Sequence, residues 1–233
     1  MGAVAMGSVS PVPRGKLRGW VALVAVLAAV SYAAQLSTSG TDNRDVLYDY
    51  ATAIGALVQY TIVLSVVLLI ARGADRRELF ALRRPASWGR AIGLTIGALL
   101  TIWAIGYVLN IFLKAGEEQG LVPDRWEPDH AEAFAANFVA VAFVAPIVEE
   151  LAFRGLGYTA VRAFYGTGAA VVATALAFGL AHGLLVALPV LSCFGAILAL
   201  LRAKTGSLYP PIILHAFFNG AALVAAVTIG TGP

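Results

Sequence analysis

Long blocks of apolar residues alternate along the chain with short polar segments. Several blocks reach the roughly 17 to 25 residues that a helix needs to cross a bilayer. We expect about seven such helices, and the block lengths leave room for six to eight. The pattern therefore predicts an all-α fold, a polytopic transmembrane helix bundle. Its helices are expected at 19–36, 51–72, 91–113, 135–160, 167–186, 187–202 and 209–229.

The boundary between the fifth and sixth expected helices has no charged residue to mark it. From Gly168 to Leu201 only His182 can carry a charge. This run is too long for one membrane span and short for two. We therefore expect a turn within "HGLLVALP", residues 182–189.

The composition agrees with an integral membrane protein. Hydrophobic residues make up 60% of the chain and charged residues 12%, whereas soluble domains contain about 25% charged residues. The net charge of +3 forms no dense basic patch, so we expect no nucleic-acid partner. A single cysteine, Cys193, excludes an intrachain disulfide and a cysteine-based metal cluster.

Charges in the loops predict the orientation. Lys and Arg collect in the N-terminal tail, the second loop and the loop after the sixth helix, whereas the first and third loops are acidic. The protein is thus expected to be a multi-pass cell membrane protein, and the positive-inside rule places its N-terminus in the cytoplasm. The Arg- and Ala-rich composition points to a bacterium.

Alternatively, the first block is a cleaved signal peptide ending near "SYA". The basic residues are Arg14, Lys16, Arg18, Arg72, Arg76, Arg77, Arg83, Arg84, Arg90, Arg202 and Lys204; the acidic ones are Asp42, Asp45, Asp49, Glu117, Glu118, Asp124, Glu127, Asp129 and Glu132.

Two adjacent glutamates, Glu149 and Glu150, lie inside the fourth expected span. A charge near the bilayer centre costs roughly 2.5–3.5 kcal/mol on insertion scales, so such residues usually mark a functional site. Glu150 and Arg154 are four residues apart and can pair on one helix face, while Glu149 points about 100° away. One carboxylate can thus be neutralised while the other acts as a general base. The alternative is a buried ion-pair knot that only joins helices.

Two histidines also lie in apolar spans. His182 ends "FGLAH", with Phe178 one turn earlier, and His215 begins "HAFFN", with Asn219 one turn later on the same face. Together with the glutamate pair, these residues predict a shared polar site within the membrane. The third histidine, His130, lies in the acidic loop, where we expect it to be solvated.

This set of residues is suited to hydrolysis of an amide or ester. Glu and His can activate water, and His and Asn can donate hydrogen bonds to an oxyanion. Alternatively, Glu149, His182 and His215 provide a His/His/Glu set of the kind that binds catalytic zinc. Zinc is therefore a candidate cofactor.

The three motifs, in this order, resemble a known family. "EELAFRG" is similar to EExxxR, "FGLAH" to FxxxH and "HAFFN" to HxxxN, the motifs of the CPBP intramembrane proteases. That family includes the type II CAAX prenyl proteases and Abi-like, bacteriocin-processing enzymes. The resemblance covers residues 135–229, the expected catalytic helical core, and leaves 1–134 as three N-terminal spans with a basic cytoplasmic loop and an acidic outer loop.

The resemblance implies roles for the site residues. Glu149 would activate water with the help of His182, while His215 and Asn219 would line the opposite side and stabilise the oxyanion. Both a metalloprotease and a glutamate-activated water without metal have been argued for the family, and the sequence leaves both open.

Three further residues are expected to shape the site: Glu150 and Arg154 by pairing, and Phe178 by packing beside His182. For the motifs to meet, the fourth helix should continue to about Thr159, with "YTAVRAFYG" forming an interfacial turn after it. Pro146 is expected to kink this helix and open a cavity.

The sequence thus predicts an intramembrane endopeptidase, metallo- or glutamate-type, that cuts a membrane-associated peptide or protein. Processing of a CAAX-type substrate, a bacteriocin or another peptide would fit. A non-catalytic membrane scaffold or bacteriocin self-immunity protein of the same fold is the alternative. A proton-relaying transporter is disfavoured, because the other spans show no polar stripe.

Overall fold

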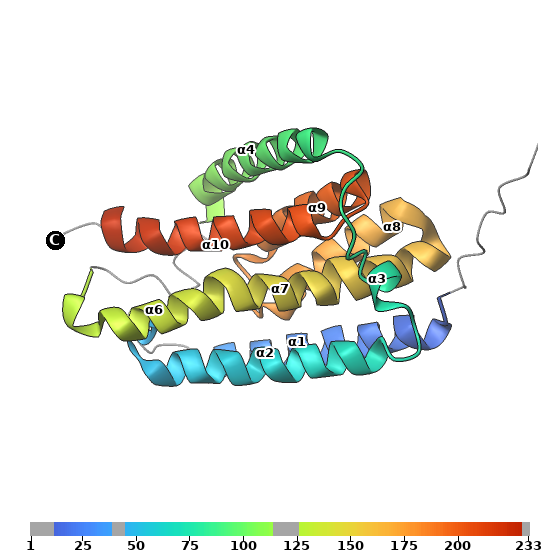
Figure 1. The fold of residues 1–233 in the computed structure, drawn as a ribbon. Coiled ribbons are helices and arrows are strands. Elements are labelled where there is room, and N and C mark those ends of the chain that lie inside the picture. Colours follow the sequence, from blue (N-terminus) through green and yellow to red (C-terminus); the bar gives the residue numbers. More distant parts are fainter. Residues whose placement is uncertain (1–11, 39–44, 114–125, 230–233) are drawn as a thin grey trace, which may run out of the picture.

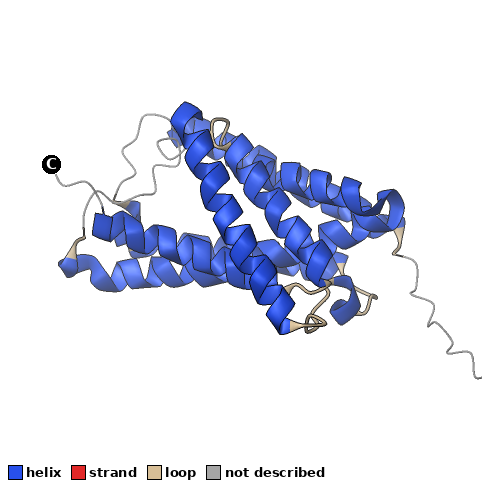
Figure 2. Ribbon diagram, turned by 90° about the horizontal axis from the view of Figure 1, so that it is seen from above, coloured by secondary structure: helices blue, strands red, loops and turns tan. Residues whose placement is uncertain are grey.

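A computed structural model of the 233-residue chain describes residues 12–38, 45–113 and 126–229. Within these ranges every regular element is helical (Figure 2), as the sequence predicts. The long helices lie side by side in a bundle, with α4 crossing it on one side (Figures 1 and 2). The elements are α1 (Arg14–Thr38), η1 (Val46–Tyr48), α2 (Tyr50–Ile70), α3 (Arg76–Leu79), α4 (Trp88–Leu113), η2 (Pro128–His130), α6 (Ala131–Val139), η3 (Ala140–Val144), α7 (Ala145–Glu150), η4 (Leu151–Gly157), α8 (Tyr158–Ala181), α9 (Leu188–Thr205) and α10 (Tyr209–Ile229).

Six stretches of the described residues are long and apolar enough to cross a membrane. Their outer faces are apolar: on α2, for example, Ile54, Val58 and Ile62 are more than half exposed. A surface of this kind suits lipid rather than water. The protein is therefore an integral membrane protein. The stretches are Arg14–Ser37, Tyr50–Ile70, Trp88–Leu113, Pro128–Ala181, Leu188–Thr205 and Tyr209–Thr228.

The fourth stretch contains 54 residues, about 81 Å of helix, which far exceeds the roughly 30 Å hydrocarbon thickness. Its backbone bends at Gly166, where φ is 81° and ψ 177°, a conformation that glycine adopts readily. The chain turns back there, so that Phe153 of η4 packs against Phe178 of α8 with ring centroids 5.4 Å apart. The bend therefore separates the fourth and fifth expected helices.

The helix before this bend runs further than expected. The motifs predict that it continues to about Thr159, and the structure continues it to Tyr165. The expected interfacial turn over "YTAVRAFYG" is wrong except at its last residue, Gly166. Pro146 lies in the first turn of α7, directly after the π-helix η3. A proline nitrogen cannot donate a helical hydrogen bond, which is compatible with the wider turns of η3.

The turn expected in "HGLLVALP" is confirmed. Helix α8 ends at Ala181, and α9 begins at Leu188. Gly183 has a positive φ of 70°, and a Cβ there would lie 2.5 Å from the backbone of Ser31. The Ser31 hydroxyl donates a 2.8 Å hydrogen bond to the Ala181 carbonyl. Helix α1 thus holds the end of α8, next to His182.

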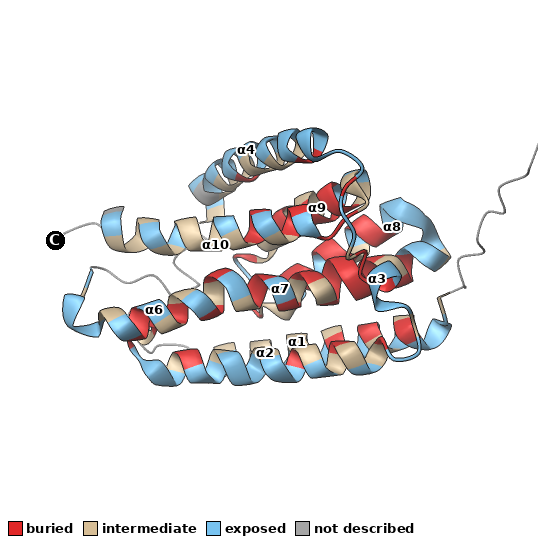
Figure 3. Cartoon of the chain, viewed as in Figure 1, coloured by how far each residue is buried: buried red, intermediate tan, exposed pale blue. Residues whose placement is uncertain are grey.

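Glycines allow close packing around η4. A Cβ on Gly155 would lie 2.7 Å from Phe80, and one on Gly157 would overlap the indole ring of Trp20. Trp20, Phe80 and neighbouring buried side chains belong to the main hydrophobic core, which includes residues of α1, α2, α8, α9 and α10. Figure 3 shows the buried positions concentrated along η4, α8 and α9. The segment that carries the glutamate pair is therefore surrounded on several sides.

The basic segments meet at one end of the bundle. Lys16 Nζ donates hydrogen bonds to the carbonyls of Ile70 (3.1 Å) and Arg72 (2.9 Å), which ties the start of α1 to the end of α2. Arg83 Nε donates a 2.9 Å hydrogen bond to the carbonyl of Gly206, after α9. The start of α1, the second loop and the loop after α9 thus lie at the same end of the bundle.

Some sequence predictions lie outside the described residues, namely the loop acids Asp42, Glu117, Glu118 and Asp124. The division into 1–134 and 135–229, and the signal-peptide alternative for the first block, stay predictions.

Candidate active site

Glu150, Arg154 and His215 form a buried polar network. Arg154 Nη1 donates a 2.8 Å hydrogen bond to Glu150 Oε1, and both side chains are fully buried. His215 Nδ1 lies 3.0 Å from the same oxygen. Arg154 Nη2 also donates to the carbonyl of Gly195 at 3.1 Å. The network therefore joins α7, η4, α9 and α10 through one carboxylate.

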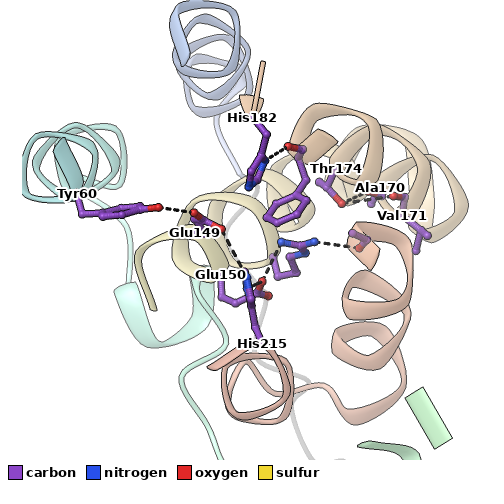
Figure 4. Close-up of polar contacts among 11 residues, drawn as sticks. Tyr60, Glu149, Glu150, Ala170, Val171, Thr174, His182 and His215 are labelled. Atoms are coloured by element: carbon purple, nitrogen blue, oxygen red, sulfur yellow. Dashed lines mark hydrogen bonds and ion pairs between the residues drawn. The ribbon is translucent and has the colours of Figure 1, made fainter. Parts of the chain in front are cut away.

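Glu149 points to a different side of the helix. Its Oε1 accepts a 2.8 Å hydrogen bond from the Tyr60 hydroxyl of α2, and its Oε2 lies 3.7 Å from His215 Nε2. Figure 4 shows Glu149 directed toward Tyr60 and Glu150 directed toward His215. Glu149 keeps 14% of its side chain exposed, against 0% for Glu150. The 100° separation in the helix thus gives the two carboxylates different surroundings.

His215 lies between the two glutamates. Since a carboxylate can only accept, His215 Nδ1 donates its hydrogen to Glu150. In the neutral imidazole, Nε2 then carries a lone pair and faces Glu149. The ring is only 3% exposed and packs edge-on against Phe194, with centroids 5.0 Å apart. Its orientation is therefore fixed by packing as well as by Glu150.

His182 approaches from the end of α8. Its Nδ1 lies 2.7 Å from the Phe178 carbonyl, so Nδ1 is the donor and Nε2 is left available. Figure 4 shows the ring directed toward the interior on the side where Glu149 lies. Glu149 and His182 are 17 and 16 residues from Gly166 on its two sides, about 25 Å of helix each. The bend therefore brings them to similar depth.

Phe178 connects the two histidines to the arginine. Its ring lies 4.4 Å from Arg154 Cζ, and its centroid is 4.6 Å from that of His182 and 5.8 Å from that of His215. A guanidinium over an aromatic face is a favourable cation–π arrangement. Phe178 is 1% exposed. This position agrees with the role expected from the sequence, in which Phe178 packs beside His182.

Asn219 lies one turn after His215 on α10. Its Nδ2 donates a 3.1 Å hydrogen bond to the Val141 carbonyl in the π-helix η3. The Nδ2 group has a second hydrogen. π-Helical turns occur often at functional sites, and here η3 supplies the carbonyl that orients Asn219.

The sequence reasoning missed Tyr60 and the Gly195 carbonyl. Tyr60 belongs to the second expected span, where the motifs place no site residue. A tyrosine hydroxyl near the middle of an apolar helix needs a hydrogen-bond partner, and this signal was present in "VQYTIV". Its partner could not be named, because Glu149 is 89 residues away.

The expected His/His/Glu set does not form a metal-ligand group. Within the described residues, no three or more His, Cys, Asp or Glu side chains lie together as a set that could hold a metal ion. The set Glu149, His182 and His215 thus does not fit zinc as it is arranged here.

Comparison with protein families finds one match, within the second half of the chain. Residues 131–221 match the family described as type II CAAX prenyl endopeptidase Rce1-like. The match covers 91 of the 233 residues. The match confirms the resemblance to CPBP proteases, while comparison with curated proteins and with solved structures gives no match. The Rce1-like domain contains every site residue predicted from the sequence, whereas Tyr60 lies outside the matched residues.

Proposed function

We propose that the protein is an intramembrane endopeptidase in which Glu149 activates the attacking water. The supporting observation is the contrast between the two adjacent carboxylates. Glu150 is fully buried and paired with Arg154, while Glu149 is partly exposed and held at one oxygen by Tyr60. A carboxylate that is oriented, accessible and free of a salt bridge to arginine is suited to general-base catalysis.

Water is activated beside Glu149 Oε2 and His215 Nε2. These atoms lie 3.7 Å apart, so one water placed about 2 Å to the side of the line between them can donate a hydrogen bond to each. The water oxygen attacks the peptide carbonyl carbon, a C–O bond forms, and its proton passes to Glu149. When the C–N bond breaks, Glu149 returns this proton to the leaving nitrogen.

His182 and Asn219 are proposed to stabilise the oxyanion. Asn219 is oriented by the Val141 carbonyl and has a second amide hydrogen to donate. His182 is oriented by the Phe178 carbonyl, and its Nε2 donates when the ring is protonated. Donors held in place before the reaction stabilise developing charge most effectively. His215, which the family resemblance puts with Asn219, is assigned here to the water because it contacts both glutamates.

No step of this mechanism passes through zinc, because the residues do not fit it. Elemental analysis of the purified protein, wild type beside His182→Ala, decides the matter. Stoichiometric zinc in the wild type that is lost in the variant would replace the proposed mechanism by a metalloprotease with His182 as ligand. A zinc-free protein that cleaves peptide would support water activation by Glu149.

We place the N-terminus and the basic loops in the cytoplasm of a bacterial cell membrane. The support is that the basic segments meet at one end of the bundle and that basic loops stay cytoplasmic. The proposed substrate is a membrane-associated peptide or protein of CAAX type, because the matched family is described as prenyl endopeptidases. The alternative substrate at the same site is a bacteriocin or another peptide.

The test is peptide cleavage by purified protein in lipid nanodiscs. Fluorogenic CAAX-type peptides, with and without a prenyl group, are compared for wild type, Glu149→Gln and Glu132→Gln. We expect Glu149→Gln to abolish cleavage. Glu132 is exposed and also accepts a tyrosine hydrogen bond, from Tyr50, so its variant should cleave normally. Cleavage by Glu149→Gln at the wild-type rate would disprove the role of Glu149. A folded wild type that cleaves none of the peptides would favour the scaffold or self-immunity alternative.

A further inference from the structure

A groove on the basic end of the bundle lies away from the glutamates and histidines. It encloses about 610 Å³ between α1 and the part of α8 that precedes the Gly166 bend. This volume is in the range of small-molecule sites. It is lined by Arg14, Leu17, Arg18, Val21, Ala22, Ala25, Phe164 and Tyr165.

The residues of α1 that line the groove form one stripe along the helix, charged at its start and apolar farther on. Arg14 and Arg18 are four residues apart, and Val21, Ala22 and Ala25 continue the same face at helical spacing. The arginines lie at the start of the helix and the apolar residues farther into the span. The groove therefore offers two positive charges at the membrane surface and an apolar wall below them.

The two arginines have no carboxylate partner within the described part of the chain. Arg14 Cζ lies 5.8 Å from the Phe164 ring, and both arginine side chains are exposed. The groove contains no acidic residue. Tyr165 is 68% exposed, and aromatic residues at this level are typical of the lipid headgroup region. The charge of the groove thus complements an anion attached to a hydrocarbon chain.

We propose that this groove binds one anionic phospholipid. The phosphate lies against Arg14 and Arg18, because guanidinium groups pair well with phosphate oxygens. An acyl chain follows Val21, Ala22 and Ala25 into the span. The lipid would come from the leaflet that faces the basic loops, where anionic lipids attract clustered Arg and Lys. The inference is independent of the proposed peptidase function.

The experiment is native mass spectrometry of the full chain released from nanodiscs containing phosphatidylglycerol and phosphatidylcholine. We compare wild type with R14Q/R18Q and with R76Q/R77Q, which removes two exposed arginines of α3 on the same membrane face. One retained phosphatidylglycerol is expected for wild type and R76Q/R77Q. In R14Q/R18Q its retention should fall about thirtyfold, since each basic residue near an anionic surface contributes about fivefold.

A second variant keeps both arginines and fills the apolar part of the groove with a large side chain. Ala22→Trp should also expel the phospholipid, although Arg14 and Arg18 remain. Equal retention in the two arginine double variants would overturn the proposal. Equal retention of phosphatidylcholine would also overturn it, because the groove would then be a non-selective apolar surface. A dimer of the wild type that is lost in Ala22→Trp would overturn it as well, because the groove would then be a contact between two copies.

Discussion

Tyr60 and Glu149 lie 89 residues apart in the chain, and the Tyr60 hydroxyl donates a 2.8 Å hydrogen bond to Glu149 Oε1. The bond joins α2, outside the Rce1-like domain, to the carboxylate proposed to activate water. It leaves Oε2 directed toward His215 at 3.7 Å. The N-terminal helices thus take part in orienting the site.

Tyr60→Phe should lower kcat/KM about ten- to hundredfold, because a hydrogen bond to a charged group contributes roughly 1.5–3 kcal/mol. The loss should fall on kcat, with KM nearly unchanged, since the hydroxyl contacts Glu149 and positions it. Steady-state kinetics with a cleaved peptide measures both values. Tyr50→Phe is the matched control, because it removes an exposed hydrogen bond to Glu132 from the same helix. Equal activities of the two variants would contradict the positioning role.

Glu150→Gln should destabilise the protein by about 3–5 kcal/mol, because it leaves the buried Arg154 without its counter-charge. Denaturation in detergent, followed by circular dichroism, measures the change. The control is Glu78→Gln, which breaks the exposed pair Glu78–Arg83 and should cost about 0–1 kcal/mol. If both variants unfold like the wild type, Arg154 is not held by Glu150.

Gly157→Ala should destabilise the protein by about 1–3 kcal/mol, because the new methyl group overlaps the Trp20 ring and forces repacking. Gly168→Ala is the control: it is also helical, and a Cβ there meets nothing within 4 Å. That variant should change stability by no more than about 1 kcal/mol. A wild-type midpoint for Gly157→Ala in the same denaturation experiment would show that α1 does not pack on η4 as described.

Asn219→Ala should reduce kcat about 10²-fold or more, the usual effect of removing one oxyanion donor. KM should change little, because this hydrogen bond strengthens only in the transition state. The variant also loses the bond to the Val141 carbonyl, so its thermal midpoint is measured in parallel. A fall in stability with an unchanged kcat would assign Asn219 a structural role only.

The sequence by itself determined the features that depend on local spacing. Hydropathy predicted the membrane helices, because an apolar segment of spanning length that folds as a helix makes all its backbone hydrogen bonds within itself. The pairing of Glu150 with Arg154 and the divergence of Glu149 follow from the geometry of a single helix. The three ordered motifs identified the family that the match over residues 131–221 confirms.

Only the tertiary structure decided how these helices face one another. It placed His215 between both glutamates, brought Tyr60 to Glu149, and located the bend at Gly166 that sets Glu149 and His182 at similar depth. Such contacts depend on the rotation and tilt of each helix, which packing against its neighbours determines. Hydropathy contains no such information, because an apolar helix suits lipid at any rotation, and so Tyr60 could be assigned a partner only once α2 and α7 were seen side by side.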